Sequence, residues 1–174
     1  MFVRRMVAGA VALVLSGALL QAPAQAADEE PVYALMVVHS GKVMTVGSLG
    51  APDPAAVFQR AYSGAMNQKF TVVPSLDRDG SFRIVDKSWW GGCIGVEGHS
   101  TAMGARLRSQ NCDGSTSQLW FFDRDRDQPD FFVLVNRRSG LVATLASSSS
   151  ADGVGFVQQI DHSLDTQVFY VAQL

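Results

Sequence analysis

Short apolar runs recur along the chain and are separated by stretches rich in Gly, Ser, Asp and Asn. Three of them, "VYALMVV" (32–38), "SFRIV" (81–85) and "FFVLV" (131–135), consist mostly of strand-forming residues in alternating or continuous order. Each run is followed by a glycine and then by a second short run, "KVMTV", "GCIGV" or "LVATL". Runs of this length bounded by turn residues predict pairs of β-strands joined by tight turns.

A repeat with a period of about 50 residues connects these runs. At a constant distance after each of the three glycines, a glutamine is followed two positions later by an aromatic residue. The glycines are Gly41, Gly91 and Gly140, and the glutamines are Gln68, Gln118 and Gln167. Repeated β units that cannot bury their own apolar faces share one core, which predicts a closed all-β arrangement. The three pseudo-repeats span about 32–73, 82–122 and 131–172.

One local pattern conflicts with this repeat. The stretch "DPAAVFQRAYSGAM", which begins at Asp53, carries a helix N-cap residue followed by proline, and taken alone it predicts a helix from about residue 54. The repeat aligns residues 57–62 with "LRSQNC" and "FVQQID", neither of which has a helical pattern. We therefore expect a strand in this segment.

The N-terminus has the features of a secretory signal peptide. Arg4 and Arg5 precede an apolar run at 6–20, which is short for a membrane span, and the small-residue tripeptide "AQA" ends at Ala26. We expect residues 1–26 to be removed, so that residues 27–174 form one secreted, soluble domain.

Charge and cysteine content narrow the possible partners. The formal net charge is −2 and becomes more negative without Arg4 and Arg5, so neither nucleic acid binding nor membrane insertion is expected. Cys93 and Cys112 are the two cysteines, and an even count in an exported protein predicts one disulfide. Closing a loop of about 19 residues stabilises the fold by about 3 kcal/mol.

The threefold Gln-x-aromatic motif, with its glycine turns and "CIGV"-like strands, resembles the ricin B-type lectin family over about residues 32–172. The resemblance implies a β-trefoil, in which a six-stranded barrel is capped by three hairpins and each repeat has one sugar pocket. In this family an Asp after the glycine turn accepts hydrogen bonds from two sugar hydroxyls, which orients the ligand. The positions of that Asp in this sequence are Thr45, Gly95 and Thr144. All three lack the carboxylate.

Other family contacts are also replaced. The stacking aromatic falls near Arg60, Gln110 and Gln159, with Phe58 or Tyr62 as alternatives in the first repeat. The Asn before the motif glutamine is present only as Asn67, because Ser117 and Thr166 stand in the other repeats. The resemblance implies that the motif glutamine and its aromatic partner belong mainly to the scaffold, where the amide meets buried backbone groups.

The second repeat has an unusual pair of aromatic residues. Trp89 and Trp90 align with His39 and Ser40, which are polar turn positions, so we expect exposed indoles that stack on a sugar or anchor a protein interface. Alternatively, one ring covers the cluster around Cys93. Glu97 lies two residues beyond Gly95, on the same predicted strand face, where it either replaces the missing carboxylate or is an ordinary surface charge. The candidate carbohydrate-binding residues are Asn67, Gln68, Trp89, Trp90, Glu97 and Asp113.

No enzyme, metal or cofactor chemistry is predicted. The three histidines have neither a metal-ligand spacing nor an evident nucleophilic partner, and the acidic segments 77–80 and 123–130 lack the full calcium-loop pattern. We expect a secreted, non-catalytic carbohydrate-binding module whose partner is a glycan. The alternative is a protein-interaction subunit of a secreted complex or toxin, similar to the trefoil subunits of cytolethal distending toxins, which the vacant Asp positions favour.

Overall fold

The computed structural model describes residues 30–47, 53–89, 91–124 and 130–174. The first repeat contributes β1 (Val32–Val37), β2 (Val43–Val46), β3 (Val57–Arg60) and β4 (Phe70–Pro74). The second contributes β5 (Phe82–Asp86), β6 (Cys93–Val96), β7 (Leu107–Gln110) and β8 (Leu119–Arg124). The third contributes β9 (Phe131–Asn136), β10 (Val142–Leu145), β11 (Phe156–Gln159) and β12 (Val168–Gln173). The predicted signal peptide and Trp90 lie outside the described residues.

Single turns of 3-10 helix accompany the strands. They are η1 (Met66–Gln68), η2 (Glu97–His99), η3 (Thr116–Gln118) and η4 (Asp165–Gln167). Within the described ranges, no helix has the length and hydrophobicity needed to cross a bilayer.

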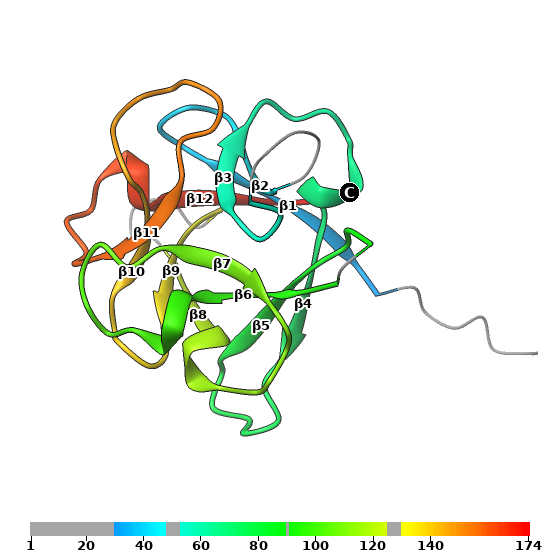
Figure 1. Ribbon diagram of the computed structural model, residues 1–174, viewed down its shortest axis with the longest axis vertical. Helices are drawn as coiled ribbons and strands as arrows, with labels where there is room; N and C mark the ends of the chain where they lie inside the picture. The colour runs from blue at the N-terminus through cyan, green and yellow to red at the C-terminus, as the bar shows by residue number, and fades with distance from the viewer. Residues whose placement is uncertain (1–29, 48–52, 90, 125–129) are drawn as a thin grey trace, which may run out of the picture.

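Six strands form a closed antiparallel barrel (Figure 1). Around the ring, β1 pairs with β4, β4 with β5, β5 with β8, β8 with β9, β9 with β12, and β12 returns to β1. The other strands form the hairpins β2–β3, β6–β7 and β10–β11, which meet one another through isolated bridges such as Phe58 with Gly155. This arrangement confirms the predicted β-trefoil.

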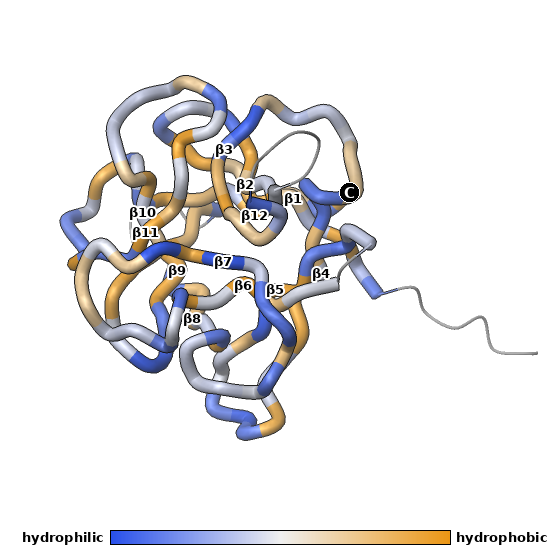
Figure 2. Tube along the Cα trace, in the orientation of Figure 1, coloured by the Kyte–Doolittle hydropathy of each residue, from blue (hydrophilic) through white to orange (hydrophobic). Residues whose placement is uncertain are grey.

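Equivalent positions of the three repeats fill the core. The buried side chains include Leu35, Ile84 and Leu134 from the first strand of each repeat, and the motif aromatics Phe70, Trp120 and Phe169. The indole N–H of Trp120 donates to the carbonyl of Ile94 at 2.8 Å, so its polar atom is satisfied inside the core. Figure 2 shows the hydrophobic segments along the strands and the hydrophilic ones in the outer loops.

The segment with the helical pattern forms strand β3. Val57 and Gln59 are buried while Phe58 and Arg60 are not, which is the two-residue period of a strand. Asp53 accepts a hydrogen bond from the N–H of Ala55 at 3.0 Å and so makes a turn before the strand instead of capping a helix. Pairing with β2 therefore overrides the local helix propensity, as the repeat predicted.

The predicted disulfide is confirmed. Cys93 at the start of β6 and Cys112 after β7 are bonded, with their Cα atoms 5.0 Å apart. The bond fixes the open end of the second hairpin, next to the turn that carries Trp89.

Candidate functional site

The motif glutamines support the loops that follow the second hairpin strands. Gln68 is buried, donates to the carbonyl of Ala61 at 2.9 Å and accepts from the N–H of Ser63 at 2.7 Å. Gln118 and Gln167 make the equivalent bonds in their own repeats. The polar atoms of Gln68 are thus engaged in the wall of the first-repeat pocket, and its predicted contact with a sugar stays a prediction.

The first-repeat pocket has a volume of about 300 Å³. Its lining residues are Thr45, Arg60, Ala61, Ser63, Ala65, Asn67, Gln68 and Asp152. Thr45 is buried at the family's Asp position, where its hydroxyl donates to Val43 and accepts from Gln68. Asn67 donates to the carbonyl of Val46 at 2.7 Å. The first repeat itself therefore supplies polar groups to this pocket but no carboxylate.

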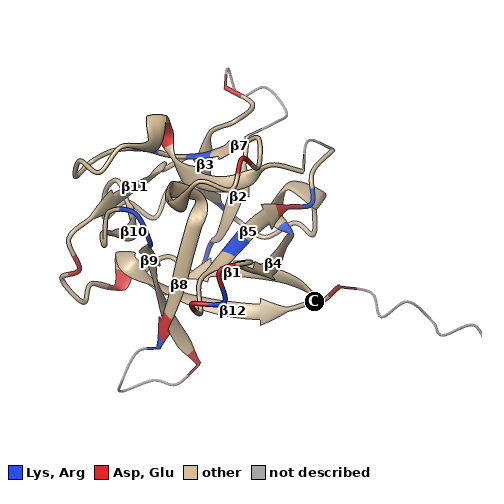
Figure 3. Ribbon diagram, turned by 90° about the horizontal axis from the view of Figure 1, so that it is seen from below, with Lys and Arg blue, Asp and Glu red and all other residues tan. Residues whose placement is uncertain are grey.

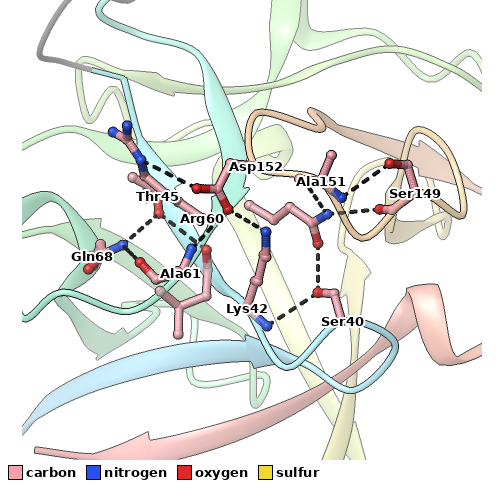
Figure 4. Close-up of polar contacts among 11 residues, drawn as sticks. Ser40, Lys42, Thr45, Arg60, Ala61, Gln68, Ser149, Ala151 and Asp152 are labelled. Carbon is pink, nitrogen blue, oxygen red and sulfur yellow. Dashed lines mark hydrogen bonds and ion pairs between the residues drawn. The ribbon is translucent and has the colours of Figure 1, made fainter.

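A carboxylate enters this pocket from the third repeat. Asp152, in the loop before β11, accepts hydrogen bonds through Oδ1 from Lys42 Nζ at 2.5 Å and from the N–H of Ala61 at 3.2 Å (Figure 4). Its Oδ2 lies 3.9 Å from Arg60 Nε. The Asp152 side chain is 49% exposed, so the carboxylate group is open to solvent although its Oδ1 is held in place.

The surroundings of Asp152 favour its charged form. The hydrogen bond from Lys42 holds the pKa of the Asp152 carboxyl below its usual range, helped by the Ala61 N–H and by the charges of Lys42 and Arg60. Sequence reasoning missed Asp152 because it lies 110 residues from Lys42 and in a different repeat. The usable signal was the trefoil order, which places the third repeat beside the first where the barrel closes.

The predicted stacking positions of the first repeat lie in different places. Arg60, with 46% of its side chain exposed, stands where the family has an aromatic residue and lines the pocket. Phe58 instead lines a hollow around the approximate threefold axis, together with Gly155. Tyr62 is exposed but is absent from the lining of the first-repeat pocket.

Gly95, at the family's Asp position in the second repeat, is closely packed. A Cβ atom on Gly95 would lie 2.7 Å from Gln118 Cγ, so glycine is required there for close packing. Asp113 faces the ring of His99, with 3.7 Å between Oδ2 and Nε2, and the N–H of Ser115 holds the pKa of its carboxyl below the usual range, with a smaller effect of His99. His99 Nδ1 lies 2.8 Å from Ser117 Oγ.

This Ser117–His99–Asp113 sequence of contacts does not form a nucleophilic site. Ser117 is 0% exposed, so no substrate carbonyl reaches its hydroxyl oxygen. The Asp113 carboxylate is exposed, and its predicted contact with a sugar stays a prediction. Among the described residues, no group of three or more His, Cys, Asp or Glu side chains is placed to hold a metal ion.

One detail of the predicted second-repeat site is wrong. Strand β6 ends at Val96, so Glu97 begins the turn η2 instead of sharing a strand face with Gly95, and its carboxylate lies 3.4 Å from Arg108 Nη1. The turn before β6 also has one residue more than its counterparts. The N–H of Asp86 bonds to Gly92, six residues on, whereas Val37 and Asn136 bond to carbonyls five residues on. An alignment of this turn counted from Asp86 therefore differs by one residue from an alignment counted back from Gly91.

The third repeat has a wider pocket of about 590 Å³. Thr144 again replaces the family's Asp and accepts a hydrogen bond from Gln167 at 3.1 Å. His39 of the first repeat reaches this pocket and contacts the carbonyl of Ser148 at 2.6 Å. Each of these two pockets is thus lined by residues of two neighbouring repeats. Among the described lining residues, a carboxylate that comes from another repeat is found in the first-repeat pocket only.

Comparisons with known proteins agree with the fold. Residues 67–159 match the sequence family described as ricin-type β-trefoil lectin domain-like. The sequence matches no curated protein. Among solved structures, the designed threefold-symmetric protein ThreeFoil is 30% identical with a TM-score of 0.74, and the match covers 82% of this chain and 99% of that one.

Two natural proteins show the same fold at lower identity. The Macrolepiota procera ricin B-like lectin, solved in complex with lactose, is 18% identical with a TM-score of 0.71, over 83% of this chain and 96% of that one. An exo-β-1,3-galactanase from Clostridium thermocellum is 23% identical with a TM-score of 0.75, over 84% of this chain but 31% of that one. With its threefold barrel and its motif glutamines in equivalent places, the chain belongs to the ricin-type β-trefoil lectin domain-like family.

Proposed function

We propose that this protein is a secreted, non-catalytic carbohydrate-binding protein whose first-repeat pocket holds a sugar residue through the carboxylate of Asp152. One observation carries the proposal: a carboxylate from the third repeat is fixed in the pocket whose own Asp position is occupied by Thr45. A carboxylate makes charge-assisted hydrogen bonds with sugar hydroxyls, and these orient a well-hydrated ligand better than neutral bonds do.

The other lining residues have complementary roles. Asp152 Oδ1 is used by Lys42 and Ala61, so Oδ2 is the oxygen that accepts from a sugar hydroxyl. Arg60 beside it donates hydrogen bonds, and its planar guanidinium lies against a sugar ring in place of the family's aromatic side chain. Asn67 lies at the inner wall of the same pocket.

The pocket chemistry favours binding over hydrolysis. Glycoside hydrolysis ordinarily uses a pair of carboxyl groups, whereas Asp152 is the single carboxylate among the lining residues of the first-repeat pocket. The low pKa of Asp152 also opposes a role as a general acid, which needs a raised pKa.

Secretion is supported by the leader sequence and by the disulfide, because disulfides persist in oxidising compartments. Expression of the full chain in a secreting host, followed by N-terminal sequencing of the exported product, tests this part. A mature N-terminus at Ala27 is expected, and retention of the full chain inside the cells would contradict it.

A printed glycan array tests the binding function, with lactose as the first soluble probe because a structural neighbour was solved with it. Wild-type protein is compared with Asp152→Asn and with Asp123→Asn, a matched change of an exposed carboxylate on β8. We expect glycan binding by wild type and by the Asp123 variant, and at least about tenfold weaker binding by the Asp152 variant. Equal binding by all three proteins, or none by wild type, would refute the proposal. The alternative role as a protein-interaction subunit stays a prediction, which co-purification from culture supernatant tests.

A further inference from the structure

The three junctions between neighbouring hairpins are not equivalent. At one junction, the buried amide of Gln59 donates to the carbonyls of Ser149 and Ala151 at 2.9 and 2.8 Å and so pins the loop of the adjacent repeat. At another, Gln158 makes the same pair of bonds to the loop at 100–102. Two carbonyls per junction are held in this way.

The junction between the first and second repeats is built differently. Ser109 stands at the glutamine position, and its hydroxyl donates instead to Asp86 at 2.5 Å. At the other two junctions, the N–H groups of Gly153 and Gly104 donate to the buried glutamine's own carbonyl at 2.9 Å. Pro54 occupies the equivalent place here and has no N–H to donate. Residues 53–56, the described part of the connection before β3, thus pack against the second repeat without the bond that Gly153 and Gly104 make at the other junctions.

A hollow of about 280 Å³ lies at this junction. Its lining residues are Gly47, Asp53, Pro54, Ala55, Ser88, Trp89 and Arg108. None of them lines the first-repeat or the third-repeat pocket, but Asp53 and Arg108 also line the hollow around the approximate threefold axis. Gly47 is needed at its edge, because a Cβ atom there would lie 2.3 Å from the carbonyl oxygen of Asp53.

An ion pair forms one wall of the hollow. Arg108 contacts both carboxylate oxygens of Asp53, with 2.9 Å between Nη2 and Oδ1, and its Nη1 lies 3.4 Å from Glu97. The guanidinium is mostly buried, and Asp53 is also held by the N–H of Ala55. A guanidinium has five N–H donors, so this fixed pair retains capacity for hydrogen bonds to a ligand. Figure 3 shows acidic and basic positions interspersed along the ribbon.

Trp89 stands at the rim of the hollow with 85% of its surface exposed. Its turn is anchored by the buried carboxylate of Asp86, which accepts from the N–H groups of Ser88 and Gly92, both at 3.0 Å. The corresponding positions of the other repeats are Val37 and Asn136, so this carboxylate anchor occurs in the second repeat only. A large apolar side chain is thereby presented to solvent from a fixed base.

We propose that this hollow is a sugar-binding subsite outside the three repeat pockets, in which Trp89 covers the C–H face of a pyranose ring and the Asp53–Arg108 pair bonds its hydroxyls. A sugar ring combines one weakly polar face with a polar edge, which matches an indole beside a charged pair. The volume is just below the usual range of ligand pockets, about 300–1,000 Å³, and suits one ring. Asp53 and Arg108 are the charged residues among the described lining of the hollow, which favours a ligand that carries hydroxyl groups beside its apolar face. The inference shares its ligand class with the proposed function but uses different residues.

Binding to the glycan array and melting temperature test the subsite in four variants. Trp89→Ala removes the indole, Trp89→Phe retains an aromatic ring, Asp152→Asn reports on the first-repeat pocket, and Leu76→Ala removes a comparably exposed apolar side chain elsewhere. We expect Trp89→Ala to bind oligosaccharides about tenfold more weakly, Trp89→Phe to retain most of the affinity, and Leu76→Ala to match wild type. The melting temperature of Trp89→Ala should stay within about 2 °C of wild type because the indole is exposed.

The outcomes separate the two proposals. Weaker binding by Asp152→Asn with no change in Trp89→Ala would overturn the subsite and leave the first-repeat pocket in place. The opposite result would support the subsite and overturn the role of Asp152, and a wild-type protein that binds no glycan would overturn both.

An NMR spectrum reports on the indole directly. The protein has three indole N–H resonances, and the Trp89 resonance is assigned as the one that is missing in Trp89→Phe. It should shift when a glycan that binds on the array is added, and an unmoved resonance would overturn the subsite.

Discussion

Replacing Gln59 by Ala tests whether the buried glutamines hold neighbouring repeats together. Gln59 is 0% exposed, and its side chain makes three hydrogen bonds outside its own strand, to the carbonyls of Ser149 and Ala151 and from the hydroxyl of Ser40 at 2.7 Å. At about 1 kcal/mol for each bond, the variant should lose about 3 kcal/mol of unfolding free energy. That is a large share of the roughly 5–15 kcal/mol typical of a domain.

Urea unfolding followed by circular dichroism measures this loss. With a slope of about 2 kcal/mol per molar urea, 3 kcal/mol lowers the midpoint by about 1.5 M. Gln110→Ala is the matched control, because its amide makes a long bond of 3.4 Å to Val96 from a partly exposed position. Because the loop that Gln59 pins carries Asp152, the Gln59 variant should also bind glycans more weakly. Equal midpoints for the two variants would refute the reasoning.

Three further predictions concern the disulfide, the pocket carboxylate and the close packing at Gly95. Replacing Cys93 and Cys112 together by Ala should cost about 3 kcal/mol, measured by urea unfolding, and reducing agent should then no longer change the midpoint. The pKa of Asp152 is lowered in the folded protein, so its charge persists above about pH 4 and is lost as pH falls through the lowered value. Glycan affinity should therefore be constant from pH 7 to about 4 and fall below it in wild type but not in Asp152→Asn, with circular dichroism confirming that both stay folded. Gly95→Ala should lose about 1–3 kcal/mol of stability by calorimetry, because its Cβ meets Gln118, and an unchanged melting temperature would contradict the close packing there.

The repeat explains why the fold was predictable from the sequence. Residues that act within one repeat, such as Gln68 with its loop or Cys93 with Cys112, lie close together in the chain, so their spacing is visible as a pattern. The strand at residues 57–60 was predictable for the same reason, because its equivalents in the other repeats lack a helical pattern.

Contacts between repeats were not predictable in this way. Asp152 reaches Lys42 across the closure of the barrel, and no local pattern indicates which loop side chain turns into a neighbouring pocket. The pairing of Glu97 with Arg108 depends on where β6 ends, and the extra residue of the second turn is visible only in the hydrogen bonds of Asp86. Such features depend on loop geometry, which short sequence motifs specify weakly.

The pairing of β12 with β1 has a consequence for the order in which the first-repeat pocket is assembled. During synthesis the first repeat emerges early, but its pocket lacks a carboxylate until the loop that carries Asp152 has followed. Folding that depends on contacts between distant parts of a chain is slow, because loops must close before those contacts form. A growing polypeptide of this kind therefore has no finished first-repeat pocket until its third repeat has been made, and the pocket is complete only once the last strand has joined the first.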